Sequence, residues 1–370
     1  MNKIMLILSC ALLFATACNK TPQNVGGNFE LRYAKAFTVD EQEDYTLIKL
    51  IDPWDTTRLL QTYVLVDRNK ELPENLPAGV LVRTPIRSAV AYSTVNCTTL
   101  DELNSLDIIK GVCEPHYIKI PQIQEGVKNG TIADVGAGHN PDVEKIIELD
   151  PEVIFASPIA GQGFGQVEKT KIPIIQTIDY LENEPLARAE WIRFYSFFTN
   201  TRQRADSLFS LTESNYNEVK ELVRDGKKHP SVFMDTPYQG NWNMPGGKSY
   251  VAVMLKDAGA NYVWADDEST KFHPLPFEAV LDKAGDADMW LIKYYSPEDL
   301  TYQSLKKENA KYVHFKAWKD KKIYGCNTIR NDYFGDLPIH PDWILKDMAA
   351  AFHPELFPAY TPRYYERLKD

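Results

Sequence analysis

Two series of alternating strands and helices, separated by one long helical stretch, constrain the fold of this chain more than any other feature of its sequence. Short apolar runs at 108–112 and 153–157 alternate with a helical pattern at 141–149, and a second series begins at 231–235. Alternation of this kind is typical of a mainly parallel sheet with helices on both faces. The sequence therefore predicts an α/β fold, and the length of 370 residues predicts more than one lobe.

The stretch between the two series has the pattern of a single amphipathic helix over 202–223. One stripe at helical spacing carries its apolar residues, which are Ala205, Leu208, Phe209, Tyr216, Val219 and Leu222. The polar residues on either side suit a helix that bridges two lobes, and at ~1.5 Å per residue it would be roughly 30 Å long. We therefore expect two Rossmann-like α/β lobes, 80–185 and 227–370, joined by a single long α-helix within a helical linker, 186–226.

A β region precedes the first lobe. The segments 29–39 and 45–51 alternate apolar with polar residues, and 62–66 has the pattern of a further short strand. We expect an extra N-terminal β extension over 29–79. The short apolar run at 80–83 is expected to open the βα series of the first lobe.

The first residues have the pattern of an export signal. Lys3 precedes an apolar run, 4–14, which is too short to cross a bilayer, and small residues stand directly before Cys18. This arrangement resembles a bacterial lipobox, so we expect a lipoprotein signal peptide at 1–17, lipidation of Cys18 and a polar tether at 18–28. An ordinary signal peptide with a chance cysteine is the alternative.

In either case the chain is expected outside the cytoplasm. With the lipobox, it would lie in the periplasm, anchored to a bacterial membrane through its N-terminal lipid alone, because no later apolar run is long enough to span a membrane. The net charge of −10 argues against nucleic acid as a partner, since little positive surface would be left to neutralise phosphates.

Three cysteines follow the signal region, Cys97, Cys113 and Cys326, and they lack metal-ligand spacing. Buried free thiols are expected, with a disulfide between Cys97 and Cys113 as the alternative. The sequence predicts no metal site and no cofactor.

The two halves of the chain repeat one local pattern. Glu144 opens a short apolar helical run that precedes an acidic turn and the strand 153–155, and Glu278 opens a similar run before the strand 289–292. Each half thus places a glutamate early on a helix that leads into a strand. The match is too short to establish a duplication.

Four stretches resemble the periplasmic binding proteins of iron-siderophore, haem and cobalamin ABC importers. They read DVGAGHNPDVEKIIELDPEVI at 134–154, EPLARAEWIRF at 184–194, NMPGGKSY at 243–250 and HPELF at 353–357. The resemblance extends from about residue 80 to the C-terminus, so that only the opening β region falls outside it.

The resemblance implies two α/β lobes joined by one long helix, with the ligand in the cleft between them. A single rigid helix resists wide hinge motion, so a largely preformed cleft is expected. The family also docks on an ABC transporter permease through one glutamate on each lobe, and Glu144 and Glu278 match those positions. The protein is expected to act as a monomer that binds its ligand without catalysis.

The ligand implied by the resemblance is a bulky metal chelate, and loops at strand ends that face the cleft are its expected contacts. Aromatic side chains suit a flat macrocycle or catecholate rings, and the cations Arg87, Lys248 and Arg330 suit an anionic chelate. His139 is a candidate ligand of haem iron or corrin cobalt, or a loop histidine bonded to backbone. The candidate ligand-binding residues are Arg87, Tyr92, Gly138, His139 and Phe164 in the first lobe and Trp242, Gly247, Lys248, Tyr250, Arg330, Tyr333 and Phe334 in the second.

The expected function is therefore that of a substrate-binding lipoprotein, which captures a ferric siderophore or haem and delivers it to the permease, with cobalamin as the alternative ligand. An extracytoplasmic hydrolase is an alternative of a different class, but the motifs Gly-x-Ser-x-Gly and His-Glu-x-x-His are absent from the sequence. A surface adhesin or carbohydrate-binding lipoprotein could use the same aromatic residues but would not need the two docking glutamates.

Overall fold

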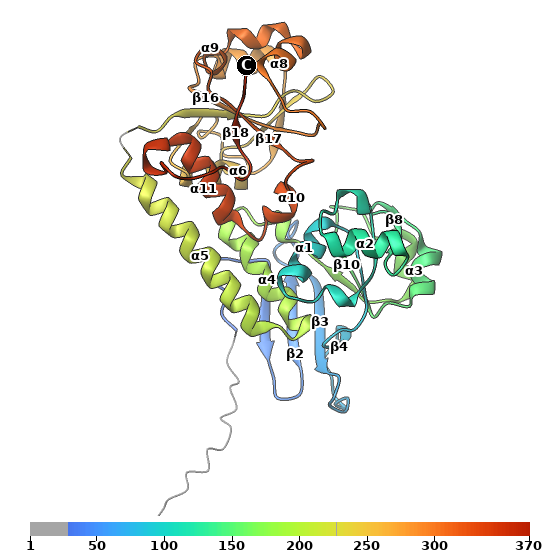
Figure 1. Ribbon diagram of the computed structural model, residues 1–370. Helices are drawn as coiled ribbons and strands as arrows, with labels where there is room; N and C mark the ends of the chain where they lie inside the picture. Colours follow the sequence, from blue (N-terminus) through green and yellow to red (C-terminus); the bar gives the residue numbers. More distant parts are fainter. Residues whose placement is uncertain (1–28, 227) are drawn as a thin grey trace, which may run out of the picture.

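The computed structural model describes residues 29–226 and 228–370 (Figure 1). The expected signal peptide, the tether and Cys18 lie outside the described residues. Within the described ranges, no helix combines the length and the apolar character that a membrane span requires. Figure 1 shows two lobes, with helix α5 running from one to the other.

A four-stranded sheet opens the chain, in the order β1-β2-β3-β4. Its strands are β1 (Phe37–Glu41), β2 (Thr46–Ile51), β3 (Leu59–Asp67) and β4 (Val80–Thr84). Neighbours are antiparallel except for β3 and β4, which are parallel. One face of this sheet packs on helix α4 (Pro185–Thr199), where the ring of Phe37 meets Trp191 and that of Tyr63 meets Phe194. The sheet therefore shares one hydrophobic core with the first lobe.

The assignment of the strand at 80–83 to the βα series was wrong. Strand β4 pairs with β3, with Val80 opposite Tyr63, and so belongs to the opening sheet. Only Val82 of this strand is buried, as in a strand with one covered face, whereas all three residues of β5 (Ala89–Ala91) are buried. Strands of parallel sheets covered by helices on both faces are apolar throughout, and β5 is the first strand with that character.

The first lobe contains a parallel sheet in the order β11-β10-β5-β6-β7. The other strands are β6 (Ile109–Val112), β7 (Ala133–Asp134), β10 (Val153–Ala156) and β11 (Ile174–Gln176), and the hairpin β8 (Gly136–Ala137) with β9 (Asn140–Pro141) lies beside them. The helices are α1 (Thr94–Glu102), α2 (Pro121–Asn129) and α3 (Val143–Leu149). Helix α1 begins directly after β5, where the Ser93 side chain accepts the Asn96 N–H and caps it.

The second lobe has its own sheet in the order β14-β12-β16-β17-β18, parallel except for the edge strand β18. Its strands are β12 (Ser231–Met234), β14 (Asn261–Tyr262), β16 (Met289–Tyr294), β17 (Ile323–Asn327) and β18 (Glu366–Arg367), and β13 (Trp242–Pro245) forms a separate pair with β15 (Phe272–Leu275). The helices are α6 (Tyr250–Asp257), α7 (Phe277–Ala284), α8 (Tyr302–Glu308), α9 (Lys316–Lys319), α10 (Tyr333–Asp336) and α11 (Pro341–Phe352).

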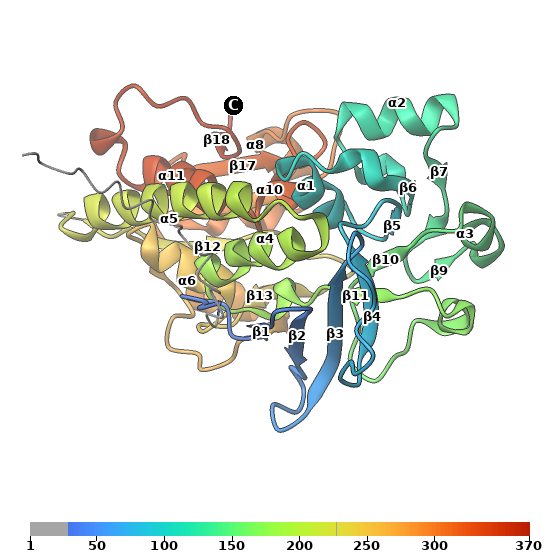
Figure 2. The same ribbon diagram turned by 90° about the horizontal axis from the view of Figure 1, so that it is seen from below.

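Helix α5 (Arg202–Arg224) belongs to both cores. Ala205 and Phe209 are buried in the core of the first lobe, whereas Tyr216 and Val223 are buried in the core of the second. Figure 2 shows α5 alongside α4, with α4 between α5 and the opening sheet. The predicted fold, two α/β lobes joined by a long helix with an additional β region, is confirmed. Leu222, which the sequence placed on the apolar stripe, is an exception because it is 46% exposed.

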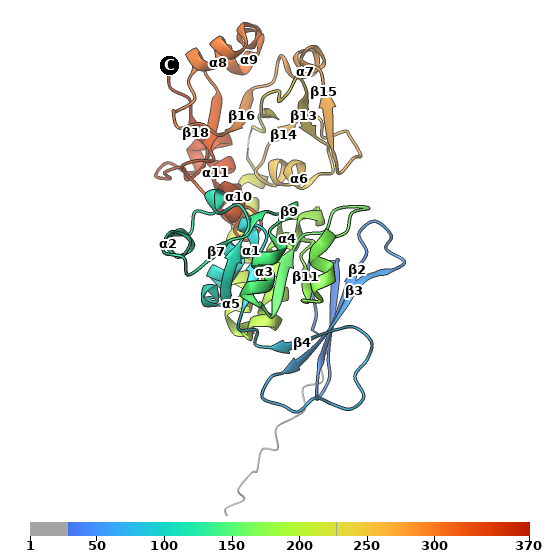
Figure 3. The same cartoon turned by 90° about the vertical axis from the view of Figure 1, so that its right-hand side faces the viewer.

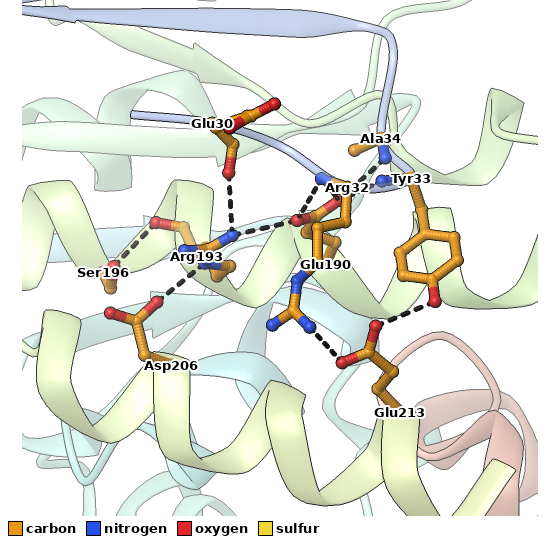
Figure 4. Close-up of polar contacts among 9 residues, drawn as sticks. All are labelled: Glu30, Arg32, Tyr33, Ala34, Glu190, Arg193, Ser196, Asp206 and Glu213. Carbon is orange, nitrogen blue, oxygen red and sulfur yellow. Dashed lines mark hydrogen bonds and ion pairs between the residues drawn. The ribbon is translucent and has the colours of Figure 1, made fainter. Parts of the chain in front are cut away.

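A fully buried carboxylate fixes the start of the described chain to α4 (Figure 4). Glu190 accepts the backbone N–H groups of Arg32, Tyr33 and Ala34 at 2.8–3.1 Å, and the Arg193 guanidinium lies 2.9 Å from it. Glu182 accepts the next two backbone N–H groups in the same way. These bonds satisfy backbone donors that would otherwise be buried without partners, so the segment leading into β1 is held against the first lobe.

Candidate functional site

A cavity of about 460 Å³ lies between the two lobes. Its walls are the segments that directly follow β5 and β6 in the first lobe and β16 and β17 in the second. Carboxyl ends of parallel strands are the usual binding position in open α/β sheets. Figure 3 shows the junction, with α10 beside α1. The lining residues are Tyr92, Ser93, Thr94, Cys113, Glu114, His116, Tyr117 and Lys119 from the first lobe and Tyr295, Thr328, Ile329, Asn331, Asp332 and Phe334 from the second.

Aromatic rings from both lobes face this cavity while remaining open to solvent. Tyr117, Tyr295 and Phe334 are 51%, 64% and 52% exposed. The rings of Tyr117 and Tyr295 meet edge to face across the cleft, with their centroids 6.4 Å apart. Clustered exposed aromatic surface is uncommon away from binding sites, so these rings offer an apolar contact surface to a ligand.

Two buried hydroxyl groups on the cavity wall lack a hydrogen-bond partner among the described residues. They are the Tyr92 phenol and the Thr94 hydroxyl, at the end of β5 and the start of α1. Burial, together with the neighbouring Cys113 thiol, raises the pKa of Tyr92 far above its usual range, so the phenol stays protonated. Both groups can therefore donate a hydrogen bond to a ligand.

Direct contacts between the lobes frame the cavity. The Lys119 ammonium donates to the Ile329 carbonyl of the second lobe. Near the far end of α1, His340 Nε2 lies 3.1 Å from Glu102 Oε1, and this hydrogen bond lowers the pKa of Glu102. Burial, with a contribution from Asp336, raises the pKa of Asp332 on the second-lobe wall.

Residues 90–329 match the family model described as "Periplasmic binding protein". The chain belongs to this family. The resemblance stated from the sequence motifs is confirmed.

Individual proteins support the family match. This periplasmic binding protein is 27% identical over 298 residues to the uncharacterized lipoprotein MJ0878 of Methanocaldococcus jannaschii. The aligned region covers 77% of this chain and 69% of the relative. It superposes on the periplasmic heme-binding protein RhuT of Roseiflexus with a TM-score of 0.56 at 20% identity, over 73% of this chain and 99% of that one. An ABC-type Fe3+-hydroxamate transport protein of Saccharomonospora viridis gives a TM-score of 0.55 at 18% identity, over 74% and 94%. These solved structures share the fold.

The structure places the predicted first-lobe residues of this binding protein at several distances from the cavity. Tyr92 lines it, and Gly138 lies beside Tyr92, since a Cβ there would stand 3.3 Å from the Tyr92 carbonyl oxygen. His139 is exposed in the β8–β9 hairpin, and Phe164 is half-buried against a small core cluster. Arg87 precedes β5, so it lies at the amino ends of the strands, opposite the cleft.

In the second lobe, Phe334 lines the cavity and the remaining predicted residues do not. Arg330 forms an ion pair with Asp299, and Lys248 is exposed near Glu268. The other four are held in the interior or in tight packing. Trp242 donates to the Met234 carbonyl at 2.8 Å, Tyr250 donates to the Leu337 carbonyl at 3.0 Å, Tyr333 is 3% exposed, and a Cβ on Gly247 would lie 2.4 Å from two backbone oxygens.

Most cavity residues were missed by the sequence analysis, although a signal for them exists. Glu114 and Tyr117 follow β6, Tyr295 follows β16 and Thr328 follows β17 directly. Reading the first few residues after each parallel strand would have found them.

The thiol expectation is confirmed, because Cys97, Cys113 and Cys326 are all buried and free. Burial raises the pKa of Cys113, which lines the cavity, to about 12. This thiol is therefore neutral and unreactive.

The two glutamates matched to docking positions are exposed on corresponding elements of the two lobes. Glu144 lies in the first turn of α3 and Glu278 in the first turn of α7. Each helix leads into a parallel strand of its lobe, β10 and β16, so its first turn lies toward the carboxyl ends of the strands. Glu278 also contacts the exposed Lys311 ammonium at 3.1 Å, a hydrogen bond that lowers the pKa of Glu278.

Proposed function

We propose that this chain is the lipid-anchored binding component of an ABC importer, which captures a ferric siderophore or haem in the cavity between its lobes and delivers it to the permease. The observation that carries the proposal is the cavity itself, which is lined by the exposed rings of Tyr117, Tyr295 and Phe334 and by the hydroxyls of Tyr92 and Thr94, which lack a hydrogen-bond partner among the described residues. Large apolar rings with a few oriented polar groups are typical of sites for bulky small molecules. Cobalamin is the alternative ligand in the same role.

The relatives support each part of this proposal. The lipoprotein MJ0878 agrees with the lipobox at Cys18, and RhuT and the hydroxamate transport protein have names that indicate haem and iron chelates. The burial of α5 in both cores favours a cleft that is largely formed before the ligand arrives. A preformed cleft avoids part of the ordering cost of binding.

Thermal unfolding of the mature chain with haem, ferric siderophores or cobalamin tests the ligand class. A ligand at a hundred times its dissociation constant should stabilise the protein by ~2.7 kcal/mol. Recovery of unchanged ligand in one-to-one amounts would support binding without turnover, whereas hydrolysis of a candidate ester or glycoside would favour an enzyme. If none of the compounds raises the unfolding temperature, the proposal is wrong.

Variants locate the site. Tyr117→Ala and Phe334→Ala should each weaken binding of the stabilising ligand by about tenfold while leaving the unfolding temperature of the free protein nearly unchanged, because both rings are half exposed. Trp54→Ala is the matched control, since Trp54 is an exposed aromatic residue between β2 and β3. Equal affinity in all three variants would place the ligand elsewhere.

We also propose that Glu144 and Glu278 dock on the permease. Exposed charges of this kind act mainly on encounter rate and register. Glu144→Ala and Glu278→Ala should keep full ligand affinity but lower chelate uptake by cells that contain the chain and its permease. The control variants are Glu148→Ala on α3 and Asp282→Ala on α7, which remove exposed acidic residues from the same helices. Uptake that falls equally with the controls would reject the docking role.

A further inference from the structure

Carboxyl groups from both lobes line the cavity. Glu114 contributes from the first lobe and Asp332 from the second. Among the lining residues that the structure describes, there is no arginine, and Lys119 supplies the one fixed positive charge. His116 also lines the cavity and is exposed.

The fixed positive charge is already engaged. The Lys119 ammonium donates to the Ile329 carbonyl across the cleft, so it serves to hold the lobes together. Withdrawing it to pair with an anionic ligand would break that contact. No ion pair to Glu114 or Asp332 is found in the described part of the chain, although the Lys119 charge acts on Asp332 and lowers its pKa against the larger effect of burial.

The cationic residues that the sequence analysis predicted as contacts of an anionic ligand lie outside the cavity. The Arg330 guanidinium is paired with Asp299 and donates to the Pro297 carbonyl. Lys248 is 3.8 Å from Glu268, and Arg87 lies at the opposite ends of the first-lobe strands. None of the three lines the cavity.

Two polar groups of the cavity wall, Tyr92 and Asp332, also bear on the ligand. The Tyr92 phenol is kept protonated by burial, so it serves as a neutral hydrogen-bond donor rather than as a phenolate ligand of ferric iron. Burial, with a smaller contribution from the nearby Asp336 carboxyl group, raises the pKa of Asp332. Loss of solvent at this wall opposes charge of either sign, whereas the carboxyl group of Asp336 opposes negative charge in particular.

We infer that the cavity selects iron chelates of zero or positive net charge over anionic catecholate chelates, haem with its propionates, and oxyanions. This inference rests on the proposed function and narrows it to one charge class of ligand. Its physical basis is the pair of carboxyl residues, Glu114 and Asp332, that line the cavity from opposite lobes without an arginine among the described lining residues.

The test compares three iron chelates that differ in charge. Ferrioxamine B is a cation, ferrichrome is neutral and ferric enterobactin is a trianion. We titrate each into the mature chain at low salt and follow quenching of intrinsic fluorescence, with haem and cobalamin in parallel. Ferrioxamine B or ferrichrome should bind at least about tenfold more tightly than ferric enterobactin or haem, and added salt should weaken ferrioxamine B selectively.

The outcomes separate the inference from the function on which it rests. Tighter binding of ferric enterobactin or haem would overturn the charge selection and leave the importer role intact. Binding of cobalamin alone would overturn the iron-chelate assignment. Failure of every compound to bind would overturn the inference and the proposed function together.

Isosteric variants then test the carboxyl groups directly. Glu114→Gln and Asp332→Asn should each weaken ferrioxamine B about fivefold, leave ferrichrome within about twofold, and improve binding of ferric enterobactin. Glu125→Gln on α2 is the control, because Glu125 is exposed and does not line the cavity. The use of two variants keeps the test valid if one of them unfolds, and unchanged charge preference in a folded variant would reject the role of that carboxyl group.

Discussion

Buried polar groups have hydrogen-bond partners where α4 holds the segment before β1, whereas two at the cleft have none among the described residues. In α4, the Glu190 carboxylate is fully buried, accepts three backbone N–H groups of that segment and pairs with Arg193. At the cleft, the hydroxyls of Tyr92 and Thr94 are buried but have no partner among the described residues. A saturated group stabilises the folded chain, whereas an open group contributes only when something outside the chain completes its hydrogen bonds.

The buried groups with complete hydrogen bonds and those without them have different roles. The segment held by Glu190 leads into β1, and its bonds keep it against the first lobe (Figure 4). The cleft must exchange water for a ligand and later release that ligand. Substitutions at saturated groups should therefore change the free energy of unfolding, and substitutions at open groups should change the affinity for the ligand.

The largest effect is expected for Glu190→Ala. The change leaves three backbone N–H groups and the Arg193 guanidinium without their buried acceptor, which should lower the free energy of unfolding by about 3–5 kcal/mol. Urea unfolding followed by circular dichroism measures it. Glu184→Ala is the control, because Glu184 is exposed at the start of the same helix and makes no side-chain cap; it should change stability by less than about 0.5 kcal/mol. Similar losses in both variants would contradict the comparison.

A smaller but more specific effect is expected from removing the hydroxyl groups of two tyrosines that differ in their hydrogen-bond partners. The Tyr63 hydroxyl donates to the Ile174 carbonyl at 3.0 Å and accepts the Gln176 N–H at 2.7 Å, whereas the Tyr92 hydroxyl has no partner among the described groups. Tyr63→Phe should cost about 1–2 kcal/mol of stability, because it leaves buried backbone groups unpaired.

Tyr92→Phe should leave stability within about 0.5 kcal/mol and weaken ligand binding by about threefold to tenfold. Urea unfolding and fluorescence titration of both variants measure the two quantities. The assignment of roles fails if Tyr92→Phe unfolds as easily as Tyr63→Phe, or if both keep full ligand affinity.

The same contrast explains which parts of the molecule could be predicted from sequence. Periodicity alone indicates elements, so the two βα series and helix α5 were found, and family motifs supplied their arrangement. Strand β4 was misassigned because an apolar run does not show which sheet it joins. The site was poorly predicted because aromatic residues such as Trp242 and Tyr250 have the same local signal in a core as in a binding wall. Only the pairing of strand ends across two lobes brings Tyr117 to Tyr295.

The smallest effect on stability is expected at Asp288, a carboxylate near the surface that has hydrogen-bond and ion-pair partners. Burial opposes its ionisation, but the Ser231 N–H and hydroxyl, each at 2.9 Å, and the Lys316 ammonium at 3.0 Å outweigh that effect and lower the pKa of Asp288 to about 2. The pKa of an aspartate in the unfolded chain is about 3.9. Because the pKa of Asp288 is lower in the folded chain, its contribution to folding stability is complete above about pH 3.9 and is lost as the pH falls toward 2.

Asp288→Asn should therefore lower the unfolding temperature at pH 7 by only about 2 °C, because the side chain is partly solvated and its ion pair is screened. Below pH 4 the difference from the parent should shrink, since the parent loses by protonation what the variant never had. Calorimetric scans between pH 7 and pH 2 measure both curves. Asp282→Asn, which changes an exposed carboxylate on α7, should follow the parent throughout. A constant gap between Asp288→Asn and the parent across this range would mean that the contacts of Asp288 stabilise the fold through geometry and not through its charge.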